Sequence, residues 1–201
     1  MKHFIPAQHE GKDMDISDSV EFENEILARN FYLEAKNRLL TINNWNEVAK
    51  VPVSTFEHLD TFGQHSEERP QEGDFVKIDI PGPGLWSTSG YDYVQIEQIN
   101  ESSDQDHDLI TLTLRPSFMP HHDHDHDHET KHFFKSMATS SFQVKRDGKT
   151  VEASYFGRNE IMNLELDSIM DRLRNIFVAL GAKLGASYPQ WKSLIEGILQ
   201  K

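Results

Sequence analysis

The sequence predicts an α+β protein. We expect an N-terminal helix, an antiparallel sheet of about five strands, and two C-terminal helices packed on one face of that sheet. Near both ends of the chain, apolar residues recur with the spacing of one helix face. In the middle they alternate with polar residues, as in strands with one buried face. With 201 residues, of which 37% are hydrophobic and 26% charged, the chain can bury one core.

The N-terminal part divides into an arm and a helix. Residues 1–18 are polar and aperiodic, and we expect them to form a flexible arm. A single α+β domain then spans residues 19–201, beginning with a helix that Asp18 or Ser19 can cap. The apolar stripe of this helix consists of Leu27, Phe31, Ala35 and Leu39.

Strands are predicted for the middle of the chain. Val76, Ile78 and Ile80 alternate with polar residues until the Pro81–Gly84 run, PGPG, ends the strand. Two further alternating segments follow, and they cover about residues 91–99 and 110–115.

The clearest local signal is a hairpin around Asp147-Gly148. These two residue types tolerate the positive φ angles of a type I′ turn. Such a turn places Val144 opposite Val151 and Phe142 opposite Ala153 on an apolar face, and polar residues on the other face.

Two helices are predicted at the C-terminal end. The helical spacing of apolar residues continues through residues 166–184, and Gly185 ends it. Ser187 can cap a last helix. Its apolar face consists of Trp191, Leu194, Ile195, Ile198 and Leu199.

Composition excludes several classes of function. The formal charge of −13 repels nucleic-acid phosphates, and no basic stripe offsets it, so we expect no nucleic-acid partner. The absence of cysteine excludes disulfides, thiolate nucleophiles and cysteine-based metal sites. No signal-peptide core and no apolar run long enough to span a bilayer is visible, so we expect a soluble, cytoplasmic protein without a membrane partner.

A His/Asp-rich loop is predicted at residues 119–132, and it contains the string HHDHDHDH. The favoured interpretation is a solvated low-complexity loop with no cofactor, which binds zinc or nickel adventitiously at most. The alternative is a metal-binding protein, because alternate residues of an extended chain share one side and neutral imidazoles bind zinc and nickel. Its candidate ligands are His122, His124, His126, His128 and His132.

Residues 128–132, HETKH, also match the H-E-x-x-H pattern of zinc hydrolases, in which Glu129 would activate water. That motif needs a buried helix. Here Lys131 is charged and the preceding residues alternate between His and Asp. A metallohydrolase is therefore only a further alternative, no catalytic residue is assigned, and we expect a binding domain rather than an enzyme.

Two other segments contain candidate ligand-binding residues. Residues 81–93, PGPGLWSTSGYDY, suit a shaped loop that presents Trp86 and Tyr91. Arg158 and Glu160, directly after the hairpin, could hold a substrate carboxylate or exchange a proton. The structural alternatives are a hairpin connection with Trp86 packed on the sheet edge, and an ion pair with a cap at a strand-to-helix junction.

The strings GDFVKIDIPGPG, GYDYVQIEQI and SSFQVKRDGKTVEASYFGRNEI resemble a family of Bacteroidetes-type bacterial proteins with no assigned activity. The helix–sheet–helix order is also similar to the helix-grip fold, in which a curved antiparallel sheet wraps a long C-terminal helix and binds ligands. This chain departs from that fold by a second C-terminal helix and by the lack of a clear first strand.

The sequence therefore predicts a non-enzymatic domain that binds a small ligand or a protein partner. We expect the site between the sheet and the helix at 166–184, with the PGPG segment at its entrance, because a curved sheet and a helix commonly enclose a pocket.

Overall fold

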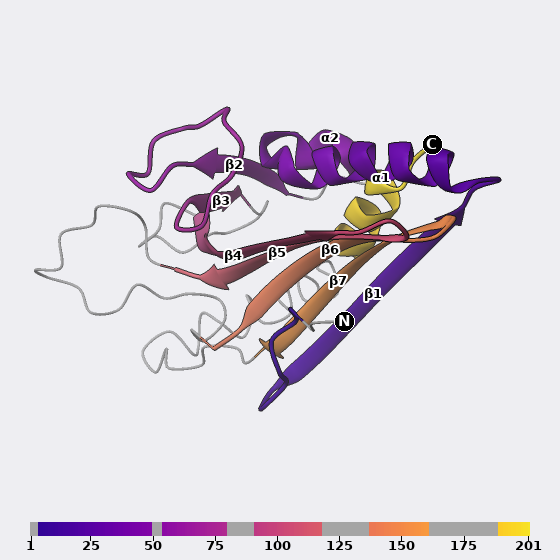
Figure 1. Ribbon diagram of the computed structural model, residues 1–201. Helices are drawn as coiled ribbons and strands as arrows, with labels where there is room; N and C mark the ends of the chain where they lie inside the picture. Colours follow the sequence, from indigo (N-terminus) through magenta and orange to yellow (C-terminus); the bar gives the residue numbers. More distant parts are fainter. Residues whose placement is uncertain (1–3, 50–53, 80–90, 118–136, 161–188) are drawn as a thin grey trace, which may run out of the picture.

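The computed structural model describes residues 4–49, 54–79, 91–117, 137–160 and 189–201 (Figure 1). Residues 189–198 are helical and are called the C-terminal helix. The other elements are β1 (Lys12–Glu21), α1 (Glu25–Leu40), η1 (Ile42–Asn44), α2 (Trp45–Val48), β2 (Thr55–Leu59), β3 (Phe75–Asp79), β4 (Tyr91–Ser103), β5 (His107–Pro116), β6 (Thr139–Asp147) and β7 (Thr150–Glu160).

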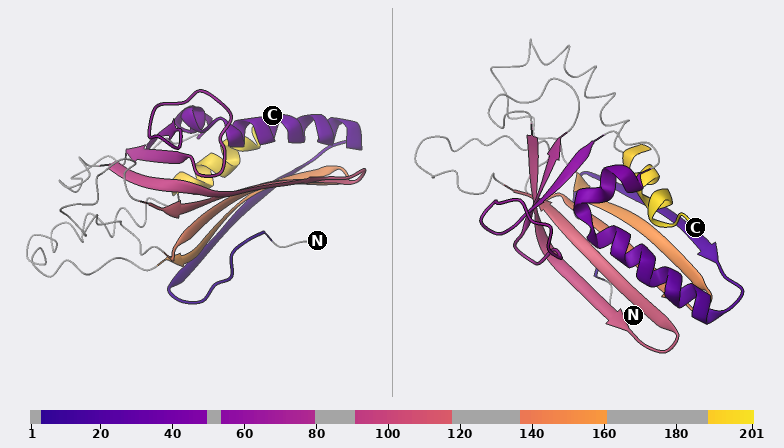
Figure 2. Two further views of the ribbon diagram at one scale, coloured as in Figure 1. Left: turned by 60° about the vertical axis from the view of Figure 1, so that its left-hand side comes forward. Right: turned by 90° about the horizontal axis from the view of Figure 1, so that it is seen from above.

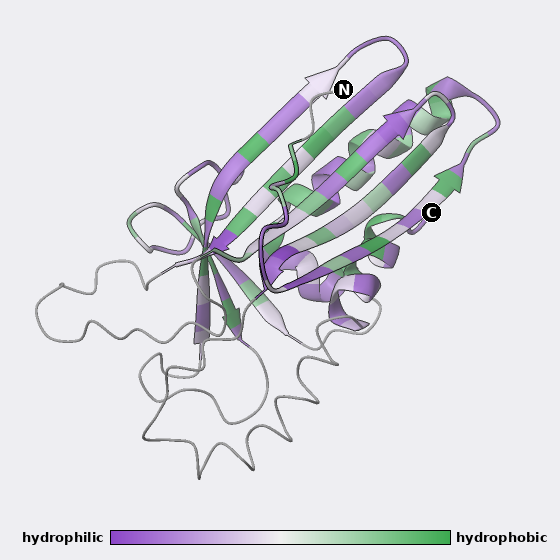
Figure 3. Ribbon diagram, turned by 90° about the horizontal axis from the view of Figure 1, so that it is seen from below, coloured by the Kyte–Doolittle hydropathy of each residue, from purple (hydrophilic) through white to green (hydrophobic). Residues whose placement is uncertain are grey.

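The strands form one antiparallel sheet in the order β1-β7-β6-β5-β4-β3-β2. Both α1 and the C-terminal helix lie over the same face of this sheet (Figures 1 and 2). The residues that precede β1 run back across the opposite face (Figure 3). The sequence showed no clear first strand, which set it apart from the helix-grip fold. β1 is that strand, so the element order of the described chain agrees with that fold.

The prediction of about five strands and two C-terminal helices is wrong. The sheet has seven strands, because β1 and β2 also belong to it. β1 lies at the sheet edge and buries only Ile16. Its sequence therefore lacks the alternation of apolar and polar residues that marks a half-buried strand. Residues 12–18 of the predicted arm therefore belong to a strand. The described C-terminal residues contain one helix, and the predicted helix at 166–184 lies outside the described residues.

The first helix begins later than expected. Its N-cap is Asn24, whose side-chain oxygen accepts a hydrogen bond from the Leu27 amide at 3.0 Å. Phe31, Ala35 and Leu39 are buried as predicted, whereas the side chain of Leu27 is 45% exposed in the first turn.

The β6–β7 hairpin exists, but its register differs from the predicted one. Gly148 and Lys149 form the loop, so Val144 lies opposite Ala153 and Phe142 opposite Tyr155. Gly148 has φ 55° and Lys149 is not left-handed, which is the φ pattern of a type II′ turn. Because the shift is two residues, every side chain keeps its predicted face.

The main core lies between the sheet and the helices. Phe142 of β6 contacts Trp45 of α2 with ring centroids 5.0 Å apart, and Trp191 of the C-terminal helix at 5.1 Å. Tyr155 of β7 stacks on the same Trp191 ring, at 5.3 Å and an interplanar angle of 20°. Aromatic contacts of this kind stabilise a core by about 0.5–1.5 kcal/mol each beyond the area that they bury. They fix the C-terminal helix above β6 and β7.

A buried ion pair connects two loops at the end of the sheet that carries the Gly148-Lys149 turn. The Nε of Arg146 lies 2.5 Å from the Asp108 carboxylate, and both side chains are almost fully buried. The same guanidinium donates to the carbonyl oxygens of Gln105, at 3.0 Å, and Gly148, at 3.1 Å. The hydroxyl of Ser103 donates to the second carboxylate oxygen. The pair thus holds the β4–β5 loop against the β6–β7 turn.

Gly197 allows the C-terminal helix to approach α2 closely. A Cβ atom at this position would lie 1.8 Å from the Val48 carbonyl oxygen, which is backbone and cannot rotate away. We expect Gly197→Ala to lower the free energy of unfolding by about 1–3 kcal/mol, as overpacking does, although alanine favours helices. Urea denaturation measures the change. The control Lys192→Ala, on the exposed side of this helix, should change it by less than about 0.5 kcal/mol. Equal stability of the two variants would contradict the close contact.

Removal of the Asp108 charge should destabilise the fold. Burial alone would raise the pKa of Asp108, but the hydrogen bonds from Ser103 and Arg146 and the charges of Arg146 and Arg29 lower it overall. We expect Asp108→Asn to cost about 3–5 kcal/mol in urea denaturation, because it leaves the Arg146 guanidinium buried without its counter-ion.

The same pair predicts a dependence of stability on acid pH. The folded-state pKa of Asp108 lies below its ordinary value of 3.8. As the pH falls, Asp108 therefore becomes protonated in the unfolded chain before it does in the folded protein. This part of the stability is present above pH 3.8 and is lost as the pH falls through the folded-state value. We expect Asp108→Asn to have a flatter stability profile in acid than the control Asp106→Asn, in the exposed β4–β5 loop. Parallel profiles would contradict this role of Asp108.

Candidate functional site

Several candidate residues lie at one end of the sheet. Tyr91 pairs with Asp79, Thr139 pairs with Arg158, and Glu160 pairs with Lys12, all at the end opposite to the Gly148-Lys149 turn. We call this end the Glu160 end. Tyr91 lies on β4 and Glu160 on β7, so β5 and β6 separate the two residues.

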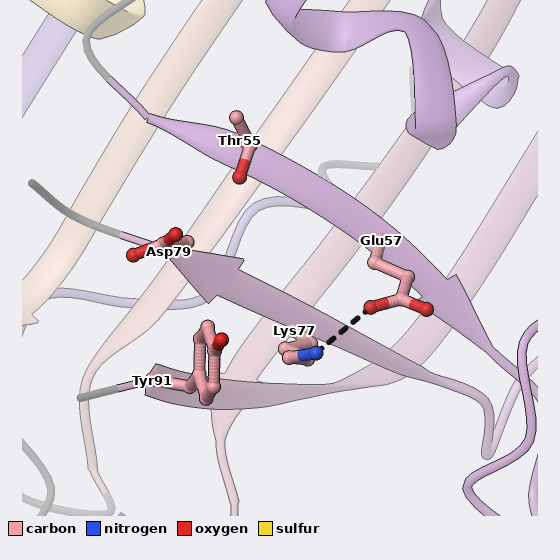
Figure 4. A pocket seen from close by; sticks show the side chains of 5 residues that line it. All are labelled: Thr55, Glu57, Lys77, Asp79 and Tyr91. Atoms are coloured by element: carbon pink, nitrogen blue, oxygen red, sulfur yellow. Dashed lines mark hydrogen bonds and ion pairs between the residues drawn. The ribbon is translucent and has the colours of Figure 1, made fainter. Parts of the chain in front are cut away.

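Tyr91 borders a small surface pocket of about 150 Å³ (Figure 4). The other lining residues are Thr55 and Glu57 of β2 and Lys77 and Asp79 of β3. The Lys77 ammonium lies 3.0 Å from the Glu57 carboxylate and 4.2 Å from the Tyr91 ring centroid. The hydrogen bond between them raises the pKa of Lys77 and lowers that of Glu57. These charges compensate each other, and the pocket is smaller than most ligand sites, which measure about 300–1,000 Å³.

Glu160 lies in a polar cluster on the helix-facing side of β6 and β7. Its Oε1 accepts a hydrogen bond from the Tyr155 hydroxyl at 3.3 Å, and that hydroxyl lies 3.2 Å from Ser140 Oγ. We call Ser140, Tyr155 and Glu160 the Glu160 cluster. A Cβ atom on Gly157 would lie 2.3 Å from Glu160 Oε1, so the carboxyl group occupies space that only glycine leaves free.

The backbone at Asn159 turns Glu160 toward this face. Asn159 has φ 54°, a left-handed conformation that asparagine tolerates better than most residues. Its side-chain oxygen accepts hydrogen bonds from the amides of His9, at 2.7 Å, and Glu10, at 3.2 Å. Its own amide donates to the Gln8 side chain at 2.8 Å. The residues before β1 thus hold the conformation that places Glu160 beside Tyr155.

Burial decides the protonation of the cluster. It raises the pKa of Glu160, and the Tyr155 hydrogen bond and the nearby Lys12 and Arg158 charges offset this only in part. It also raises the pKa of Tyr155. The phenol therefore remains neutral at physiological pH, and the carboxyl group holds its proton to higher pH than an exposed glutamate.

Arg158 does not join Glu160. It forms an ion pair with Asp15 of β1, donates to the Gly157 carbonyl at 2.8 Å, and lies over the Phe156 ring. In a regular strand Arg158 and Glu160 would point to the same face, because successive side chains alternate between the two faces. The left-handed conformation of Asn159 interrupts this alternation and brings Glu160 to the face of Tyr155.

Trp86 and all five candidate metal ligands, at positions 122–132, lie outside the described residues. In the part of the chain that the structure describes, no group of three or more His, Asp or Glu side chains is placed to hold a metal ion. His58 pairs with buried Asp74 at 2.9 Å, and His65 contacts Glu57 and Glu67. No described helix is both long enough and apolar enough to cross a bilayer.

Sequence reasoning missed Ser140 and Tyr155 as site residues. One signal was present: a glycine inside a strand pattern, here Gly157, often marks a close approach by another group. The identity of that group depends on the fold.

No protein-family model and no curated protein matches the chain, so the resemblance to a Bacteroidetes-type family finds no support. Similar solved structures include a hypothetical protein from Helicobacter pylori, with 7% identity, coverage of 98% of both chains and a TM-score of 0.49. They also include major latex-like protein 151 from Panax ginseng, with 14% identity, coverage of 86% of this chain and 98% of that one, and a TM-score of 0.39. A third is Ara h 8.0201, with 12% identity, coverage of 94% and 100%, and a TM-score of 0.36. Likeness at this level assigns no activity to the chain.

Proposed function

We propose that this protein binds a small, mainly apolar molecule without transforming it, and that the Glu160 cluster anchors the ligand's polar group. The observation that supports this proposal is the position of a half-buried carboxyl group beside a phenol on the apolar, helix-facing side of the sheet. Small-molecule sites typically have apolar walls with a few polar groups that fix orientation. The Tyr155–Trp191 stack supplies the apolar wall next to the cluster.

The chemistry of the cluster favours an uncharged ligand. A carboxyl group with a raised pKa can donate a hydrogen bond to a ligand when it is protonated, and the neutral Tyr155 hydroxyl, which donates to Glu160 Oε1, orients that carboxyl group. The protonated carboxyl group suits a carbonyl or hydroxyl oxygen. An anionic ligand would be repelled by the acidic protein, whose formal charge is −13. The guanidinium of β7, Arg158, already pairs with Asp15 and so does not compensate an anion here.

Fluorescence titration with acedan, an uncharged naphthyl ketone, tests the proposal. We expect one molecule per chain to bind. Tyr155→Phe should weaken binding about three- to tenfold, because it removes the hydroxyl that orients the Glu160 carboxyl group. The affinity should fall as the pH rises through the raised pKa of Glu160, above its ordinary value of 4.5, because the protonated carboxyl group is the donor.

Two variants separate the cluster from general surface effects. Glu160→Gln resembles the protonated side chain at every pH, so its affinity should not depend on pH. The control Glu152→Gln, on the opposite sheet face where Glu152 pairs with Lys145, should keep the wild-type dependence. Absence of acedan binding, or unchanged affinity in Tyr155→Phe together with unchanged pH dependence in Glu160→Gln, would exclude the site.

A further inference from the structure

The outer edge of β1 presents backbone groups that β7 does not use. The Phe22 amide donates to the Lys149 carbonyl at 3.0 Å, immediately beyond the Glu21–Thr150 pair. In an antiparallel ladder, hydrogen-bonded residues alternate along each strand. The even-numbered residues of β1 therefore face β7, and Asp15, Ser17 and Ser19 direct their N–H and C=O groups outward.

A local hydrogen bond agrees with this orientation. The Ser19 amide donates to its neighbour Asp18 Oδ1 at 2.8 Å, so one outward N–H group is already occupied. Proteins commonly protect edge strands with charged side chains. Within the described ranges, the outward N–H groups of Asp15 and Ser17 donate no hydrogen bond.

A groove of about 490 Å³ runs along this exposed stretch, between β1 and the C-terminal helix, which lie side by side in Figure 2. Its β1 side consists of residues 15–18, and its helix side of Lys192, Ile195 and Glu196. Ile16 and Ile195 are buried and form an apolar base. The groove therefore combines backbone groups that no described residue uses, an apolar base and charged walls, which are the features used when an extended peptide adds a strand to a sheet.

Charge identifies the kind of partner that fits. β1 has the sequence KDMDISDSVE, with one lysine and four acids. Two copies of β1 would bring together two strands that each carry four acids and one lysine, and this repulsion makes a second copy of the chain a poor occupant. A strand with alternating lysine or arginine would place a cation beside Asp18, which has no ion-pair partner among the described residues.

We propose that the groove binds an extended, lysine- or arginine-bearing segment of another polypeptide, which pairs with the backbone at Asp15 and Ser17 as an eighth strand. This site is distinct from the Glu160 cluster, which lies on the helix-facing side of β6 and β7. The two proposals can therefore succeed or fail separately.

Calorimetric titration with a blocked peptide of alternating lysine and valine tests the docking site. Ser17→Pro removes the outward N–H group, and proline is tolerated on edge strands where the N–H faces away from the ladder. We expect Ser17→Pro to bind the peptide at least about tenfold more weakly than the wild type. The matched control Ser17→Ala keeps the N–H group and should stay within about twofold. Equal affinity of the proline and alanine variants would overturn the proposal.

A second comparison needs no change to the protein. The same peptide, N-methylated at alternate residues, keeps its charge and loses the donors that a strand requires, so its binding should disappear. A peptide of alternating glutamate and valine should not bind either. Equal binding of the methylated or the acidic peptide, or no binding of the lysine peptide, would show that no strand adds at this edge.

The charge contribution has its own variant. Asp18→Asn retains an oxygen acceptor for the Ser19 amide and removes one negative charge. We expect it to weaken binding of the lysine peptide about two- to fivefold at low salt and to reduce the salt dependence of the affinity. An unchanged affinity and salt dependence would place the peptide elsewhere on this acidic protein.

Discussion

The position of Phe142 on the interior strand β6 decides how the rest of the structure is arranged. Its ring contacts Trp45 of α2, Trp191 of the C-terminal helix and Tyr155 of β7. Elements from both ends of the chain thus meet at one side chain. The C-terminal helix forms one wall of the β1 groove, and Tyr155 belongs to the Glu160 cluster, so both proposed sites depend on this packing.

Two carboxyl groups of the fold have opposite pKa shifts for a clear physical reason. Asp108 is buried, but the hydrogen bonds from Ser103 and Arg146 and the Arg146 charge hold its pKa below the ordinary value. Glu160 is half-buried beside a neutral phenol, and burial raises its pKa more than the phenol's hydrogen bond lowers it. The first group stabilises a charged pair that connects two loops. The second is available to exchange or share a proton, which makes it the better candidate for ligand contact.

The sheet face opposite to the helices is polar but largely buried at its centre. Thr113 and Ser141 share a hydrogen bond at 3.1 Å, and Gln143 donates to Thr111 at 3.0 Å. Buried hydroxyl groups need such partners, because an unsatisfied polar group destabilises the fold. These pairs connect β5 with β6 on the face opposite to the Phe142 contacts.

The sequence by itself determined the elements whose side-chain period is strong and local. The burial of Phe31, Ala35 and Leu39, the apolar face of the last helix and the faces of the β6–β7 hairpin all follow from spacing that neighbouring residues enforce. Only the tertiary structure decided the remainder. β1 has weak alternation and becomes a strand because β7 offers its edge, and Gly197 is needed because α2 approaches it. Glu160 meets Tyr155 because residues 8–10 hold the Asn159 turn from the far end of the chain. Contacts between residues this distant in sequence leave no periodic signal, so folding must bring them together before their chemistry is visible.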